Sequence, residues 1–141
     1  MATSQELRKR CTELGKSEEF IQSFEASKAY AIVLNDIQNA DNIKLISRGG
    51  RVLSKALFAV HRSDCIVIMT GRQLKIYDGT WKGPDIFSIR YDSIKSYKLL
   101  GSSGLWLRTS EGRGDLGNGE YHIHINGNAQ KAIAVLNSFL E

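Results

Sequence analysis

Basic side chains are concentrated in the part of the sequence whose pattern predicts β-strands. Lys55, Arg62, Arg72 and Lys75 lie within or beside the first three of these strands. If they share one face of a sheet, they could bind an anionic ligand such as a lipid head group, a nucleotide or nucleic acid, because clustered cations attract phosphate groups. The alternative is that they are the solvated exterior of the sheet. The sequence leaves both interpretations open.

Two histidines, His122 and His124, alternate with an apolar residue. In a strand they would lie on one face, about 6–7 Å apart by the strand rise. A metal ion could bridge them if Glu120, on the same face, supplied a third ligand. The alternative is a pair of solvated imidazoles opposite a buried row of the same strand. We take the solvated pair as the expected state, and we predict no metal or other cofactor.

Residue patterns that support catalysis are missing. The chain has three histidines, no G-x-S-x-G sequence and no cysteine–histidine pair at a known spacing, so little is available for acid–base or nucleophilic work. The glycine-rich run at residues 112–119 lacks the Lys-Ser/Thr pair of a phosphate-binding loop. We therefore expect no enzyme.

The length and composition favour a single folded unit. The chain has 141 residues, of which 42% are hydrophobic and 24% charged, proportions that are ordinary for a globular protein. Its net charge of +4 is uneven: residues 1–46 sum to −1 and residues 47–125 to +5. The sequence shows neither an apolar stretch near the ~20 residues of a membrane span nor a signal-peptide core. We therefore predict no transmembrane segment and a cytoplasmic location.

The two cysteines lie in unlike surroundings. Cys11 follows a basic run, whereas Cys65 opens an apolar run. We therefore expect Cys11 to be a surface thiol and Cys65 a small buried side chain, without a disulfide between them.

The first 48 residues are predicted to form a helical segment. Thr3 or Ser4 can cap a first helix that ends at Gly15, and Ser17 can begin a second. A stripe of mainly apolar side chains then recurs at three- and four-residue steps, which predicts a helix face packed against another element. Residues 43–46 fit either a last helical turn or a short strand. The stripe consists of Phe20, Phe24, Ser27, Ala31 and Leu34.

After Gly49-Gly50 the apolar period changes to two, which predicts β-strands over residues 49–125. The connections are too short for parallel crossovers, so neighbouring strands must be antiparallel. The predicted strands are Val52–His61, Cys65–Thr70, Leu74–Tyr77, Ile86–Tyr91, Ile94–Leu99, Leu105–Thr109 and Tyr121–Ile125.

Alternation predicts one dry and one wet face for most of these strands. The run Cys65–Met69 is apolar on both faces, so something must cover its outer side, and the N-terminal helices are the obvious candidates. An apolar stripe over residues 128–140 predicts a final amphipathic helix that closes one end of a strongly curved sheet or barrel. The predicted fold class is therefore α+β: N-terminal helices, a seven-stranded antiparallel barrel or sandwich over residues 49–141, and a C-terminal capping helix.

This order of seven strands and one helix resembles the pleckstrin-homology-like (PH-like) fold, and two phrases resemble its bacterial branch. Residues 65–78, CIVIMTGRQLKIYD, are similar to that family's second and third strands. Residues 89–97, IRYDSIKSY, are similar to the phrase that links its fourth and fifth strands.

The resemblance implies a non-enzymatic binding module. In eukaryotic members, phosphoinositide recognition uses basic residues around the first hairpin. Lys55 and Arg62 match that region, but Asp64 puts a carboxylate where a phosphate needs a cation. We therefore expect a protein-interaction or self-assembly module that uses open strand edges. The alternative is a module for an anionic lipid, nucleotide or nucleic acid, bound through Lys55, Arg62, Arg72 and Lys75.

Overall fold

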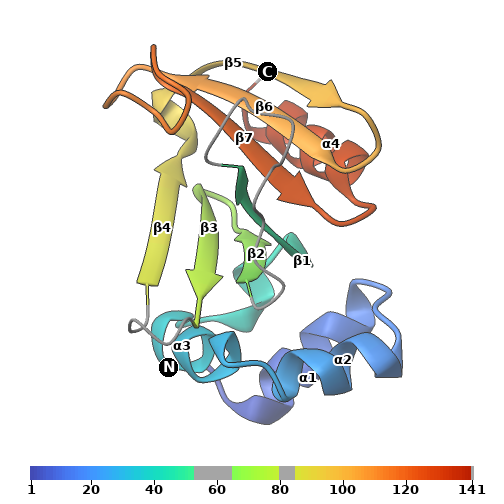
Figure 1. Cartoon of the computed structure of the whole chain (residues 1–141). Coiled ribbons are helices and arrows are strands. Elements are labelled where there is room, and N and C mark those ends of the chain that lie inside the picture. The colour runs from blue at the N-terminus through green and yellow to red at the C-terminus, as the bar shows by residue number, and fades with distance from the viewer. Residues whose placement is uncertain (53–64, 80–84, 141) are drawn as a thin grey trace.

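The computed structural model describes residues 1–52, 65–79 and 85–140. It is an α+β structure in which N-terminal helices precede seven antiparallel strands and a C-terminal helix, as the sequence predicts (Figure 1). The elements in chain order are α1 (Ser4–Glu13), α2 (Glu18–Glu25), α3 (Ala29–Asp36), η1 (Ala40–Asn42), β1 (Leu45–Val52), β2 (Cys65–Met69), β3 (Gln73–Asp78), β4 (Asp85–Arg90), η2 (Tyr91–Ser93), β5 (Ile94–Leu100), β6 (Gly104–Thr109), β7 (Glu120–Ile125) and α4 (Ala129–Leu140).

Strand β1 joins the two halves of the sheet, whose order is β4-β3-β2-β1-β7-β6-β5. Its first half, Leu45–Arg48, pairs with β2, and its second half, from Gly49 to Val52, pairs with β7. The β-carbon of any other residue at Gly49 would overlap the carbonyl oxygen of His124. Glycine is therefore required where β1 leaves one half-sheet and enters the other.

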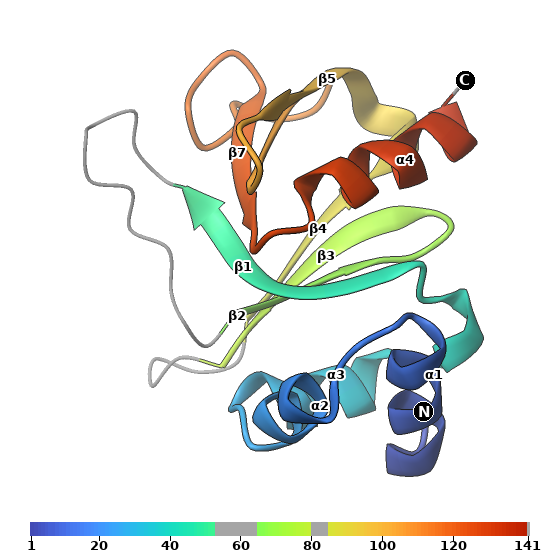
Figure 2. The ribbon, with the colours of Figure 1, turned by 90° about the vertical axis from the view of Figure 1, so that its right-hand side faces the viewer.

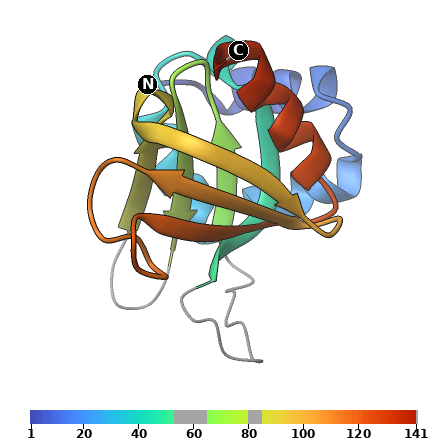
Figure 3. The same cartoon turned by 90° about the horizontal axis from the view of Figure 1, so that it is seen from above.

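The sheet is not a closed barrel, which corrects the more enclosed form that we predicted. Within the described ranges no ladder joins β4 to β5, the first and last strands of the order. The short turn η2 carries the chain directly from one half-sheet to the other. Helix α4 packs against β5, β6, β7, β1 and η2 (Figures 2 and 3). The helix therefore covers core that strand pairing leaves open, and its Ala132 and Leu136 are fully buried there.

The first strand lies earlier than predicted. The sequence pattern suggested Val52–His61, whereas β1 is Leu45–Val52, and residues 53–64 lie outside the described part of the chain. The open choice at residues 43–46 is resolved, because Leu45 and Ile46 begin this strand. The predicted boundary between residues 48 and 49 consequently falls inside β1.

The N-terminal helices cover the outer face of the β1–β3 half-sheet, as predicted (Figure 2). Ile66 and Ile68 belong to an apolar core shared with α1, α2 and α3. Cys65, Val67 and Met69 point to the other core, between the half-sheets and α4. Every side chain of β2 is therefore buried, and the double-sided apolar run is explained.

Helix ends follow the sequence signals, although the stripe of apolar residues does not mark one continuous helix. Thr3 and Glu6 form a reciprocal capping box, and Ser17 caps α2 by accepting from the amide of Phe20. Helix α2 ends at Glu25, and a separate helix, α3, begins at Ala29. The buried residues of α3 are Ala29 and Val33.

Cys11 is not a surface thiol, contrary to our expectation. It lies on the inward face of α1 beside Leu7 and is 2% exposed, and burial raises the pKa of its thiol to about 11. Two residues of the basic run before it are themselves engaged: Arg8 pairs with Glu18 and Glu25, and Arg10 donates to the carbonyl of Ile43. A basic run therefore did not indicate an exposed helix face here. Cys65 is buried as predicted, and no disulfide joins the two cysteines.

A polar cluster ties α3 to β3. The Nζ of Lys75 and the hydroxyl of Tyr77 each donate to Oδ2 of Asp36, both at 2.7 Å. Burial alone would raise the pKa of Asp36, but the two donors outweigh it and hold the pKa below its ordinary value. The folded state therefore favours the carboxylate, and its stabilisation is lost as the pH falls through the lowered pKa.

Replacing Asp36 with alanine is expected to lower the free energy of unfolding by about 2–3 kcal/mol near neutral pH, because the Tyr77 hydroxyl and the Lys75 ammonium lose their acceptor. Urea unfolding of both proteins at neutral and strongly acidic pH measures this. The penalty should shrink in acid, where the wild-type carboxylate is protonated too. Tyr77→Phe, which keeps the Lys75 pair, should cost less. An Asp36→Ala penalty that is equal at both pH values would contradict this role.

Candidate functional site

The predicted anion-binding residues are only partly brought together. Lys55 and Arg62 lie outside the described residues. Arg72 is exposed in the β2–β3 turn, and Lys75 lies on the helix-facing side of β3. Both line a groove of about 720 Å³ between that turn and the segment linking α3 to β1. The charge of Lys75 is already engaged by Asp36, so Arg72 is the better placed of the two to meet a ligand.

The two histidines lie on one face of β7, as the alternation predicts. His122 is opposite Trp106 in β6, and His124 is opposite Gly104. Burial lowers the pKa of His122. Within the part of the chain that the structure describes, no three His, Cys, Asp or Glu side chains gather closely enough to hold a metal ion. Glu120 therefore does not complete a metal site with this pair.

Strand β5 is an exposed edge of the sheet. It pairs with β6 along one side, and no described strand pairs with its other side. Its last two residues, Leu99 and Leu100, are 42% and 38% exposed. Unpaired backbone groups beside exposed apolar side chains are the usual template for pairing with another chain.

A groove separates the open edge of β5 from α4, beside which the strand runs (Figure 3). Its volume is about 420 Å³. The hydroxyl of Tyr97 donates to Oδ1 of Asn137 at 2.7 Å, which fixes the spacing between strand and helix. The groove is lined by Tyr97, Lys98, Leu99, Gln130, Ile133 and Asn137.

Successive residues of β5 face opposite sides. Tyr97 and Leu99 share the side of the groove. Lys98 is directed to the outer face, where its ammonium lies 5.0 Å from the ring centroid of Trp106, and Leu100 shares that face. The strand contains two lysines and no acidic residue. It therefore combines an apolar groove with a positively charged edge.

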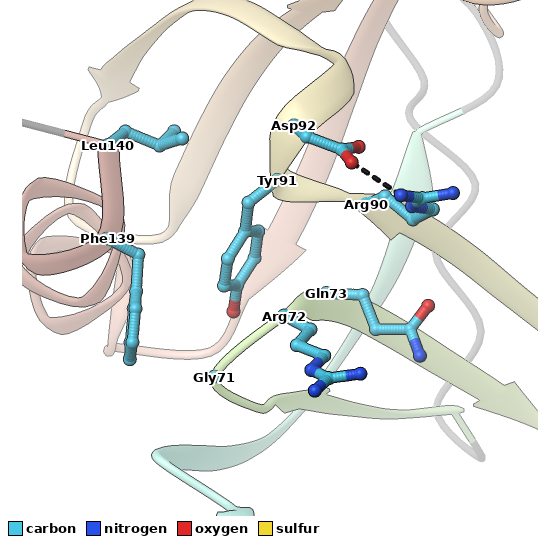
Figure 4. A pocket seen from close by; sticks show the side chains of 8 residues that line it. All are labelled: Gly71, Arg72, Gln73, Arg90, Tyr91, Asp92, Phe139 and Leu140. Carbon is cyan, nitrogen blue, oxygen red and sulfur yellow. Dashed lines mark hydrogen bonds and ion pairs between the residues drawn. The ribbon is translucent and has the colours of Figure 1, made fainter.

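A second pocket lies at the C-terminal end of α4 and has a volume of about 690 Å³ (Figure 4). Phe139 is 45% exposed and stacks on Tyr91, with 5.9 Å between ring centroids. Tyr91 is held by a 2.6 Å hydrogen bond to the carbonyl of Thr70, and burial raises the pKa of its hydroxyl. Arg72 forms part of the opposite wall. The pocket offers an aromatic anchor beside a cation.

These surfaces were not identified from the sequence. Among the five large apolar side chains that the described residues expose most, Leu99, Leu100 and Phe139 lie on β5 or α4. The sequence feature that could have indicated the exposed edge is the adjacent pair Leu99-Leu100 at a strand end. Neighbouring residues of a strand point to opposite faces, so a sheet with one buried face can bury only one of the two. The groove itself depends on how closely α4 approaches β5, which no local pattern reports.

No family model matches the chain, and no curated protein matches it. None of the described helices combines the length and apolar character that crossing a membrane requires. The function is therefore inferred from the geometry of this chain.

Proposed function

We propose that this chain is a non-enzymatic, PH-like binding module that takes up an extended segment of another protein along β5. The proposal of a PH-like module is supported by the seven antiparallel strands followed by one helix, and by β1, which serves both half-sheets. The observation that carries the binding proposal is the open edge of β5, with its groove against α4.

Strand addition at this edge would use two kinds of contact. The backbone groups on the outer side of β5 would pair with those of the incoming segment and supply affinity. Every second side chain of that segment would point into the groove. There Leu99, Ile133 and the ring of Tyr97 offer apolar contact, which would supply specificity.

Charge favours a foreign segment over a second copy of this chain. Antiparallel pairing of two β5 strands would bring Lys95 and Lys98 of each copy close to those of the other, and like charges on paired strands are destabilising. A segment that alternates acidic and apolar residues would instead match the two lysines and the groove. The expected partner is therefore an acidic, extended segment of another protein.

Leu99 and Leu100 offer a matched pair of variants, because they are adjacent, similarly exposed and on opposite faces of β5. We expect peptides selected from a displayed random library on the wild-type protein to be rich in acidic and apolar residues. Leu99→Lys should weaken their binding by roughly tenfold or more, since it places a charge in the groove. Leu100→Lys should change the affinity by less than about threefold. Fluorescence anisotropy with labelled peptides measures both.

If the two variants lost peptide affinity equally, or if neither lost any, the groove would not be the surface that contacts the peptide. Size-exclusion chromatography with light scattering supplies the second check. A stable dimer that Leu99→Lys dissociates would show that a second copy, and not a foreign segment, occupies the edge.

A further inference from the structure

A basic recess lies at the far end of β5 from the exposed leucines. It is formed by the start of β5, the end of β6 and the loop at residues 110–119, and its volume is about 740 Å³. Three cations line it, namely Lys95, Arg108 and Arg113, together with the polar side chains of Ser110 and Asn118. No carboxylate is among its lining residues.

A β-bulge places one of these cations. The strand register moves from Ile94 opposite Thr109 to Ser96 opposite Arg108, so Lys95 is an extra residue in β5. Bulges redirect a side chain and are frequent beside functional sites. Here the bulge puts Lys95 and Arg108 at the same recess, although they come from neighbouring strands.

The three cations are exposed and meet at one recess that has no carboxylate among its lining residues. Neither Lys95, Arg108 nor Arg113 forms an ion pair within the described ranges. Glu120, opposite Arg108 on β7, and Glu111, in the loop, do not line the recess. An anion bound in the recess would therefore meet three positively charged side chains that line it. Among the described residues, cations that pair with carboxylates include Arg8, Arg10, Arg51, Lys75 and Arg90.

Neither acidic residue of the loop, Glu111 or Asp115, lines the recess. Asp115 is turned toward Arg51, with 3.3 Å between Oδ1 and Nη1, and that side chain is 13% exposed. Gly117 and Gly119 have φ values of 85° and 76° and place no side chain in the recess. The amide of Gly119 donates to the carbonyl of Arg113 at 2.7 Å. This hydrogen bond fixes the backbone of the loop at Arg113, the third cation of the recess.

We propose that this recess binds a phosphate-bearing anion. Two guanidinium groups can each donate two parallel hydrogen bonds to phosphate oxygens, and the lysine adds a point charge. The site is separate from the β5–α4 groove, and it differs from the four basic residues that the sequence suggested. The ligand could be a phosphate compound in solution or the phosphorylated head group of a lipid, since both present the same chemistry.

The test compares two double variants that remove equal charge. Arg108→Gln with Arg113→Gln alters the recess, whereas Lys9→Gln with Lys131→Gln removes two exposed cations elsewhere. The probes are inorganic pyrophosphate, followed by NMR titration, and phosphatidylcholine vesicles with or without a phosphorylated phosphatidylinositol, followed by sedimentation. Binding of at least one probe should weaken by roughly tenfold or more in the recess variant, and by less than about threefold in the control.

Binding of pyrophosphate alone would assign the site to a ligand in solution. Binding of the phosphorylated vesicles with little pyrophosphate affinity would assign it to a lipid head group. Either result, if sensitive to the recess variant, supports the proposal. Absence of binding to both probes overturns it, as does an equal loss in the two variants, which would reflect net charge only. All four substituted side chains are exposed, so both variants are expected to fold.

Discussion

Replacing Gly49 with alanine is expected to destabilise the protein by about 3–5 kcal/mol or to prevent folding, which would place it among the most damaging single substitutions. The added β-carbon would overlap the backbone carbonyl of His124 and would lie 3.1 Å from Cγ2 of Val67. A backbone atom cannot move aside as a flexible side chain can. The β1–β7 ladder, which holds the two half-sheets together at the bend of β1, would therefore have to separate locally.

Gly71→Ala is the matched control, because its β-carbon would meet only the ring of Phe139, with Cζ at 3.6 Å and Cε1 at 3.7 Å, which are ordinary contact distances. We expect that variant to lie within about 1 kcal/mol of the wild type. Denaturant unfolding monitored by circular dichroism compares the two. If Gly49→Ala proved no more harmful than Gly71→Ala, the close approach of β1 to β7 would be wrong.

Replacing Leu136 with alanine is expected to cost about 2–5 kcal/mol, the range for large cavities in well-packed cores. Leu136 is fully buried on the inner side of α4, among residues from both half-sheets. The sheet is open, so this helix and not a further strand ladder seals the core. A cavity under α4 would also loosen one wall of the β5–α4 groove.

Lys131→Ala on the exposed side of the same helix should change stability by no more than about 0.5 kcal/mol. Thermal and urea unfolding measure both variants, and the peptides selected on the wild type report on the groove. A Leu136→Ala variant as stable as Lys131→Ala would mean that α4 does not seal the core.

The sequence predicted which segments form strands and which form helices where the spacing of apolar side chains and the helix-capping residues indicated the same element. Alternation in β4, β6 and β7 marked the buried sides, and the structure places Ile89, Leu105 and Ile123 in the core as expected. The apolar run of β2 signalled two covered faces, which required a second layer of helices. The sequence offered Thr3 or Ser4 for the first helix start and Ser17 for the second, and the structure has Thr3 and Ser17 as the caps, whose hydroxyls satisfy otherwise unpaired amides.

Other features depend on contacts between distant segments. Gly49-Gly50 looked like a break between segments, yet these residues lie within β1, because a strand that changes partners at a bend needs glycine at the close approach. The apolar stripe predicted for the N-terminal region includes residues of both α2 and α3. The three- and four-residue spacing of its apolar side chains continued past the turn that separates the two helices, so the spacing did not reveal the turn. The expectation for Cys11 was wrong because it took the charge of the preceding residues as a sign of exposure, whereas Arg10 is half-buried and donates to the carbonyl of Ile43.

The candidate site was less predictable than the fold. Lys75 was expected to bind an anion, but Asp36, which is 39 residues away in sequence, pairs with it. The basic recess gathers Lys95, Arg108 and Arg113 through a bulge and a loop conformation. Strand alternation alone does not place bulges. The groove at β5 exists only because α4 returns to that edge.

Amide hydrogen exchange of the protein with and without a selected peptide tests the central proposal most directly. If the segment adds to β5, amides on the outer side of Ile94–Leu100 should gain protection from exchange, together with residues of α4 that face the groove. Protection confined to the opposite edge, β4, or to the pocket around Arg72 and Phe139, with β5 unchanged, would contradict binding by strand addition at β5.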